Sequence, residues 1–265
     1  MKAFIISRNH GSPHRNLSWL GWLAVILIAL GWQAAAAMMK LPLLLPTPRE
    51  AFAQVLSMIM TWDFWRHLSA TLSRGLIGFG FSLALGLALG GLAGKKPAVE
   101  AFFRPLIVLI RSTPVMSVII LALIWFPRDF VAIFVTFMMA FPIVIQNVIE
   151  GVRNINRSLT EMITVYQVRR DLRITKFYLP SLAPFLAAGI SGGLGITWKV
   201  LVAAEVLAYP KWGIGAQMDT ARVYLQTDKV FAWTLIVVSL GLFFDYLLDL
   251  LLKKPFGAWK VNEND

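Results

Sequence analysis

The sequence predicts an all-α integral membrane protein with six transmembrane helices. Of its 265 residues, 58% are hydrophobic and only 15% are charged, whereas soluble domains carry about 25% charged residues. The apolar surplus falls into long runs, each sufficient to cross a bilayer. The Lys and Arg residues between the runs are divided unequally between the two expected sides of the membrane. A soluble fold would need several buried helices with almost no polar face, so we reject it.

The apolar runs set the expected domain organisation. The spans cover residues 18–38, 70–94, 104–126, 129–149, 184–208 and 230–252. They form a transmembrane domain over 18–252, between a leader of residues 1–17 and a tail of residues 253–265. The first run ends in the small residues QAAAAMM, so a cleaved signal peptide is an alternative to a retained span. The run is long for a signal peptide, which favours the retained span.

The distribution of basic residues predicts the orientation. Fifteen Lys and Arg residues lie on the side of the two termini and of the loop 150–183, against seven on the other side. Because cytoplasmic loops are enriched in Lys and Arg, both termini are expected in the cytoplasm. The net charge of +11 follows from this bias, and we expect no nucleic-acid partner.

Two external segments show features beyond those of simple loops. Thr47, Pro48 and Glu50 match a capping box with Pro at the first helical position. They predict an amphipathic helix over about 48–60 that lies on the outer membrane surface. The polar, Gly-containing segment 209–230 is expected to form an external lip or gate.

Small residues recur every fourth position of the second span. They are Gly78, Ser82, Gly86, Gly90 and Gly94. Such a face lets two helices approach closely. Packing within one bundle is favoured over a seam between two copies of the chain.

The residue inventory argues against several chemistries. The chain has no Cys, and its three His residues lie outside the apolar runs. Disulfides, Cys nucleophiles and thiolate metal sites are therefore excluded. We expect no metal site and no catalytic residue.

One loop is crowded with charge: SLTEMITVYQVRRDLRITKFYLPSLAPF, which begins at Ser158. Ser158 and Glu161 match a capping box, and Asp171 is placed to cap a second short helix that Pro180 ends. The first helix carries an apolar stripe of Leu159, Met162, Ile163 and Tyr166. A protruding helical pair with an apolar ridge and a basic rim is typical of a docking element. The alternative is a basic loop that rests on lipid headgroups.

The loop resembles the cytoplasmic EAA loop of the membrane subunits of ATP-binding-cassette importers. Glu161 matches the opening Glu of that motif, and Leu179-Pro180 match its closing Leu-Pro. The likeness extends from LPTPREAF to the sixth span and is closest to permeases for nitrate, sulfonate and taurine. The chain departs from the motif at Met162 and Ile163, and Gln167 stands where the motif has Gly. The turn at Gln167 is therefore expected to differ in shape.

The resemblance implies a type I importer permease in the bacterial cytoplasmic (inner) membrane, with a coupling-helix loop. Its implied partners are two copies of a separate ATPase, a second permease copy (identical or a paralogue), an extracytoplasmic solute-binding protein and membrane lipid. The implied substrate is a small anionic or heterocyclic solute. ATP and Mg²⁺ would bind to the ATPase alone, so we expect no cofactor on this chain. Its nearest Walker-like string, GGLAGKKP, follows Leu89 where a Walker motif needs Gly, and its Lys95 precedes another Lys.

Three charged residues lie in or near the spans: Arg111, Lys199 and Glu205. Each would cost roughly 2.5–3.5 kcal/mol at the bilayer centre, so each should face a partner or a cavity. Ion pairing with neighbouring helices is favoured, and attraction of an anionic substrate by Lys199 or Arg111 is the functional alternative. Lys199 and Glu205 lie about 120° apart around one helix and should not pair. The resemblance adds Thr113, Gln146, Asn147 and Trp198 as pathway candidates.

Two other functions fit the sequence less well: a secondary transporter and a membrane-embedded enzyme. A secondary transporter driven by an ion gradient would be expected to show inverted repeats with broken helices, and no such repeat is evident. A membrane-embedded enzyme would need catalytic groups within the spans, and no span carries an intramembrane His or paired carboxylates. Asp245 and Asp249 lie near the cytoplasmic end of the sixth span. The sequence thus favours an ATP-driven importer subunit.

Overall fold

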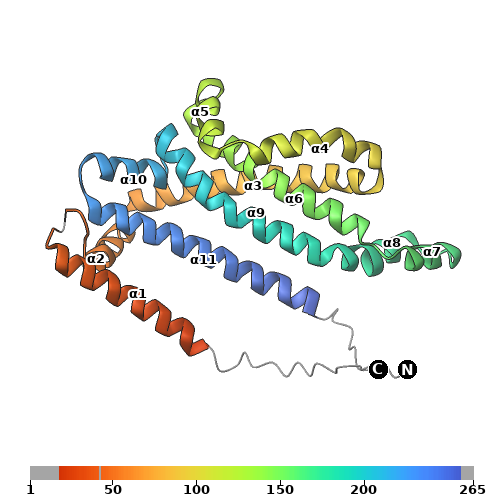
Figure 1. Ribbon diagram of the computed structural model, residues 1–265, viewed down its shortest axis with the longest axis horizontal. Helices are drawn as coiled ribbons and strands as arrows, with labels where there is room; N and C mark the ends of the chain where they lie inside the picture. Colours follow the sequence, from red (N-terminus) through yellow and green to blue (C-terminus); the bar gives the residue numbers. More distant parts are fainter. Residues whose placement is uncertain (1–17, 42, 258–265) are drawn as a thin grey trace, which may run out of the picture.

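The computed structural model describes residues 18–41 and 43–257, and the described residues form helices without a strand. The helices are α1 (Ser18–Met39), α2 (Pro48–Ile59), α3 (Trp62–Lys95), α4 (Pro97–Ser112), α5 (Val115–Trp125), α6 (Arg128–Arg153), α7 (Arg157–Val165), α8 (Arg170–Arg173), the π-helical turn η2 (Ile174–Tyr178), α9 (Leu179–Ala208), α10 (Ile214–Val223) and α11 (Thr227–Gly257). The long helices run along the long axis, with α7 and α8 at one end and α2 and α10 at the other (Figure 1). We call these the knob end and the lip end.

The described residues hold five helices able to cross a membrane, and a bent helix pair that would make a sixth segment. Among the described residues, α1, α3, α6, the continuous helix from α8 through α9, and α11 are each long and apolar enough to cross a bilayer. The sixth segment is the pair α4 and α5, which meet at an angle of 101°. The span predicted over 104–126 is therefore not one continuous helix: its first part begins at Pro97, and the helix is interrupted after Ser112. Pro114 explains the break, because it holds Thr113 in an extended conformation (φ −76°, ψ 127°) that a helix cannot contain.

The C-terminal helix extends beyond the expected end of the sixth span. Helix α11 continues to Gly257, so the chain is still helical where the tail is expected to begin at residue 253. The leader 1–17 and residues 258–265 lie outside the described residues.

Helix α3 packs on α6 along its small residues. A Cβ at Gly86 would lie 2.6 Å from Val144 Cγ1, and one at Gly94 would lie 2.6 Å from Val152 Cβ. The Ser82 hydroxyl donates to the carbonyl of Phe137 at 3.0 Å. Only residues without a larger side chain permit this approach. Packing within one bundle is confirmed, and the face is not free to serve as a seam between copies.

The apolar core lies where α3, α6 and α9 meet. Val135, Ile145 and Leu201 are fully buried there. Most apolar side chains of α1, in contrast, are exposed, among them Ile28 at 72%. Such exposure in a 22-residue apolar helix fits contact with lipid.

The predicted capping box of α2 is confirmed. The Thr47 hydroxyl accepts from the Glu50 N–H at 3.3 Å, and a Glu50 carboxylate oxygen accepts from the Thr47 N–H at 2.8 Å. The helix ends at Ile59, one residue before the predicted end. The Gln54 amide donates to the Asp228 carboxylate at 2.6 Å and ties α2 to the start of α11.

The caps predicted for the charged loop are wrong. Helix α7 begins two residues earlier than expected, because Asn156 is its N-cap and accepts from the Leu159 N–H at 3.3 Å. Ser158 therefore lies inside the helix, and Glu161 pairs with Arg157 at 3.1 Å. Asp171 does not cap α8 either; it lies within the helix and pairs with Arg169 at 3.0 Å.

Pro180 does not end a helix, which corrects another expectation. The chain stays helical from α8 through η2 into α9, with Pro180 in the first turn of α9 and Pro184 further along. The wider hydrogen-bond spacing of a π-helical turn directly precedes Pro180, which itself has no N–H to donate. The turn explains how the helix tolerates Pro180.

The turn after α7 keeps the left-handed conformation that a Gly would favour. Gln167 has φ 47°. Its N–H donates to the carbonyl of Thr164 at 3.1 Å, and the Val168 N–H donates to that of Ile163 at 3.2 Å. These two bonds form a Schellman motif. The expectation of a differently shaped turn is wrong: Gln167 adopts the conformation at a cost of about 1–2 kcal/mol.

Candidate functional site

The knob, defined as residues 157–178, presents apolar side chains outside the bundle. On α7 the exposed residues are Leu159, Met162, Val165 and Tyr166, with exposed fractions from 43% to 78%. Leu172 and Ile174 continue this surface, as does Leu179 just beyond the knob. Arg157, Arg169, Arg170 and Lys176 are exposed beside it. An exposed apolar patch with a charged rim is typical of an interaction site.

Ile163 is not part of the exposed ridge, contrary to the sequence prediction. Its side chain is only 8% exposed, against 48% for Met162. Consecutive residues of a helix point about 100° apart, so Ile163 faces the protein while Met162 and Tyr166 face outward. Ile163 therefore anchors α7, and the ridge consists of its neighbours.

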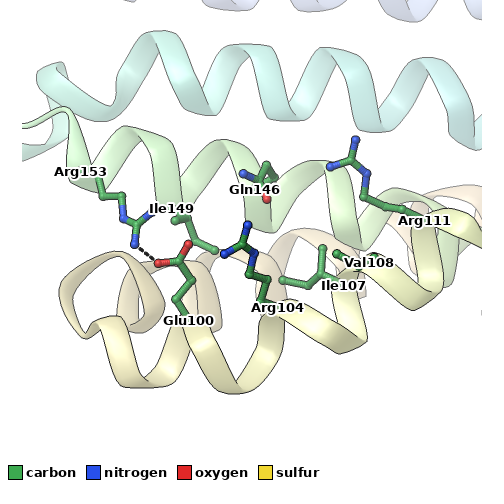
Figure 2. Close-up of a pocket in the computed structure, with 8 residues that line it drawn as sticks. All are labelled: Glu100, Arg104, Ile107, Val108, Arg111, Gln146, Ile149 and Arg153. Carbon is green, nitrogen blue, oxygen red and sulfur yellow. Dashed lines mark ion pairs between the residues drawn. The ribbon is translucent and has the colours of Figure 1, made fainter.

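A cleft of about 390 Å³ opens between α4 and α6 (Figure 2). Its lining is Glu100, Arg104, Ile107, Val108 and Arg111 from α4, and Gln146, Ile149 and Arg153 from α6. Helical spacing explains this set, because residues three or four apart share one helix face. Glu100, Arg104 and Arg111 lie at positions i, i+4 and i+11 of α4, and Gln146 and Arg153 lie two turns apart on α6.

The cleft is basic and only partly neutralised. It holds three arginines and one carboxylate, and Arg153 forms an ion pair with Glu100 (Figure 2). Arg104 and Arg111 have no carboxylate partner among the described residues. Because a charge facing lipid costs several kcal/mol, these two guanidinium groups indicate a cavity that water enters.

A second polar cluster lies at the lip end, and its central residues Arg74 and Glu205 are buried. Glu205 of α9 is fully buried and accepts from Arg74 of α3 at 2.8 Å. It also accepts from the Thr71 hydroxyl at 2.8 Å and from the Gly215 N–H at 3.0 Å. Arg74 donates further to the Asp129 carboxylate at 2.5 Å.

The same cluster fixes the lip, residues 209–226. Arg74 donates to the carbonyl of Trp212 at 2.6 Å, the Ile214 N–H donates to Thr71 at 2.8 Å, and the Gly213 N–H donates to His67 Nδ1 at 3.0 Å. We call the set His67, Thr71, Arg74, Asp129 and Glu205 the latch. It ties the lip to α3, α6 and α9 and supplies a partner for each buried charge.

The structure brings four of the seven pathway candidates together in two pairs: Arg111 with Gln146, and Trp198 with Lys199, which line one pocket between α9 and α11. Arg111 and Gln146 line the cleft, whereas Glu205 belongs to the latch, so pairing with a neighbouring helix is the correct alternative for Glu205. Lys199 and Glu205 do not pair, as predicted. Lys199 lines a separate pocket between α9 and α11 with Asp245.

The other three candidates have local roles. Trp198 is buried and stacks on Phe244, with a ring-centroid distance of 4.5 Å. The Asn147 amide donates to the carbonyl of Ile143 at 2.8 Å. The Thr113 hydroxyl donates to the carbonyl of Leu109 at 2.8 Å, at the break between α4 and α5. None of the three lines the cleft.

Sequence reasoning missed Arg74, Glu100, Arg104 and Arg153 as site residues. Arg104 and Arg153 were counted only as basic loop residues. Arg74 lies inside the expected second span, and a charge in a span was the signal that could have identified it. The described residues contain no group of three His, Asp or Glu side chains able to hold a metal ion.

The fold is that of a multi-pass membrane component, with a basic cleft between α4 and α6 and an exposed apolar ridge on the knob. Residues 82–256 match the family described as binding-protein-dependent transport system inner membrane component, and the chain belongs to that family. It is a permease subunit of an importer of the ATP-binding-cassette class, as the resemblance implied.

Named relatives are similar over most of the chain. The aliphatic sulfonates transport permease protein SsuC of Bacillus subtilis is 31% identical over 88% of this chain and 87% of its own length. The taurine transport system permease protein TauC of Escherichia coli is 28% identical over 87% of this chain and 84% of its own. The bicarbonate transport system permease protein CmpB of Synechococcus elongatus is 26% identical over 69% and 66%.

Proposed function

We propose that the chain forms the translocation pathway of an ATP-driven importer and that the knob couples it to a separate ATPase. The observation that carries this proposal is the exposed apolar ridge of α7 at one end of the bundle. In solution such a ridge would remain in contact with water, whereas a partner groove would bury it. Burial of a Met or Leu side chain contributes about 1.5–3 kcal/mol.

The basic residues support a cytoplasmic position for the knob end. The side that holds the knob has fifteen Lys and Arg residues, against seven on the other side, and cytoplasmic loops carry this excess. The lip end would then face the outside, where an extracytoplasmic binding protein delivers the solute. ATP and Mg²⁺ would be held by the ATPase, and this chain would bind neither.

We further propose that the solute is a small anion. The relatives are named for sulfonates, taurine and bicarbonate, all of which carry an anionic oxygen group. The cleft between α4 and α6 has an excess of positive charge. A second permease copy, identical or a paralogue, would complete the transporter with two ATPase subunits, because one chain offers one knob.

Charged substitutions on the ridge test the coupling role. Met162→Asp and Tyr166→Asp should prevent co-purification of the ATPase and abolish ATP-driven uptake, because a carboxylate cannot be buried in an apolar groove without a large cost. Ile163→Asp is unsuitable, since Ile163 is buried in the permease itself. The matched control is Thr164→Asp, which adds the same charge to an exposed site about 160° around α7 from Met162.

The control should retain the ATPase and at least most of the uptake. All three variants should reach wild-type abundance in the membrane, since the sites lie outside the packed bundle. If Met162→Asp and Tyr166→Asp retained both the ATPase and normal uptake, the loop would be only a basic topological segment and the proposal would be wrong.

A further inference from the structure

We infer that Arg104, Arg111 and Gln146 form a binding site for a small oxyanion, with the Glu100–Arg153 ion pair at its mouth. This inference rests on the proposed import of an anionic solute and assigns it a place on the chain. It concerns the cleft alone, and it can fail while the coupling role of the knob holds.

The geometry places the two free cations along one wall. Arg104 and Arg111 are seven residues apart on α4, which corresponds to a rise of about 10 Å. Both side chains extend toward α6, and the Gln146 side chain lies on α6 between them (Figure 2). Arg104 and Arg111 are exposed and Gln146 is half-buried. A small solute could therefore reach all three.

The chemistry of these groups selects an oxyanion. A guanidinium group donates two parallel hydrogen bonds to carboxylate-like oxygens, and such charge-assisted bonds are about twice as strong as neutral ones. The Gln146 amide adds a polar group from α6, on the facing wall; it donates one N–H to Glu150 at 3.0 Å and has a second N–H to offer. A sulfonate group and bicarbonate each present at least two oxygens on one atom, which the two parallel N–H groups of a guanidinium can bind together.

The third arginine occupies a different position in the cleft. Arg153 lies at the knob end of α6 and is neutralised by Glu100. An anion held by Arg104 and Arg111 therefore meets a closed ion pair in the direction of the knob. Arg153 also precedes the first residue of α7 by only four positions. The ion pair thus lies close in sequence to the knob.

Thiol labelling can detect the site because the natural chain has no Cys. Val108 lies between Arg104 and Arg111 on the cleft wall and is 56% exposed. The full-length Val108→Cys variant would be placed in phosphatidylcholine nanodiscs. Its labelling rate would be measured with sulfonatoethyl methanethiosulfonate, an anion, and with trimethylammonioethyl methanethiosulfonate, a cation.

Each labelling rate is divided by the rate of the same reagent with a free thiol. If the cleft holds an anion site, this ratio should be about tenfold higher for the anionic reagent than for the cationic one. Arg104→Gln together with Arg111→Gln should abolish this preference, whereas Lys95→Gln, which removes an exposed charge outside the cleft, should not. Glu100→Gln should increase the preference, because it removes the only carboxylate of the cleft lining. Met60→Cys at the lip end should show none of these changes.

Competition identifies the occupant. Ethanesulfonate should slow labelling at Val108→Cys, and its neutral analogue ethanesulfonamide should not. Equal rates with both reagents, or no protection by ethanesulfonate, would overturn the inference. Protection that requires phosphatidylglycerol in place of ethanesulfonate would also overturn it, because the site would then hold a lipid headgroup. The assay uses no ATPase, so its result is independent of the ridge variants.

Discussion

Helix α6 packs against α3 on one side and lies beside α4 on the other. The arginines at these two contacts differ in burial and in the carboxylates that neutralise them. On one side α3 approaches it through glycines, and its Arg74 is bonded to carboxylates from α6 and α9. On the other side α4 leaves a cleft, and its Arg104 and Arg111 have no carboxylate partner among the described residues. The same residue type is thus buried and neutralised in one place and exposed and free in another.

The difference follows from the cost of charge in a membrane. A buried guanidinium group is tolerated only when its hydrogen-bond donors and its charge are matched. The latch meets both conditions and fixes the lip. In the cleft only Arg153 is paired, with Glu100, whereas Arg104 and Arg111 have no carboxylate partner among the described residues. The latch therefore fixes the lip to the bundle, and we propose that the cleft is available to the solute.

Removal of the latch arginine should have the largest effect on stability. Arg74→Met leaves Glu205 buried without its cation, which should cost about 3–5 kcal/mol. The melting temperature of the purified permease should fall markedly, and the lip should become accessible to protease. Arg66→Met, on the exposed part of the same helix, is the control and should cost at most about 1 kcal/mol.

The double variant sharpens the test. Arg74→Met with Glu205→Met removes both buried charges and should be more stable than Arg74→Met alone. If the single variant melted like the wild type, the latch would not hold the lip, and the contrast between the two arginine clusters would lose its basis.

Substitution of a glycine at the contact between α3 and α6 should have the next largest effect on stability. In Gly86→Ala the new methyl group would meet Val144 at 2.6 Å, and overpacking of this kind costs about 1–3 kcal/mol. Gly80→Ala is the matched control on the same helix, because nothing lies within 4 Å of its added Cβ. Thermal unfolding in detergent should separate the two. Equal melting temperatures would show that α3 and α6 are not held at close contact.

Much of the fold could be predicted from the sequence because its signals are local. Apolar run length located the spans, and the capping residues at Thr47 and Glu50 located α2. The break at Pro114 was missed, although the effect of Pro on the preceding residue is also local. The apolar residues resume directly after Arg111, Ser112, Thr113 and Pro114, and the length of the whole segment could not distinguish one straight helix from a bent pair.

The site was harder to predict because it depends on contacts between distant segments. Arg111 and Gln146 were identified separately, but the sequence did not show that α4 and α6 bring them together. The N-cap of α7 is Asn156 and not Ser158. Asn and Ser cap helices about equally well, so residue type alone could not show at which of the two the helix begins. The burial of Ile163 depends on how the knob folds back on the protein, which its stripe of apolar residues does not determine.

Uptake by the reconstituted transporter gives the most direct test of the division between latch and cleft. The measurement is ATP-driven uptake of the solute that the system's binding protein is found to bind, expressed per folded permease. Arg111→Gln should leave the melting temperature unchanged, because exposed substitutions usually alter stability by less than about 0.5 kcal/mol. It should lower uptake at least about tenfold through loss of a charge-assisted contact, while Lys95→Gln transports normally. Wild-type uptake by Arg111→Gln would contradict the assignment of the cleft to the solute.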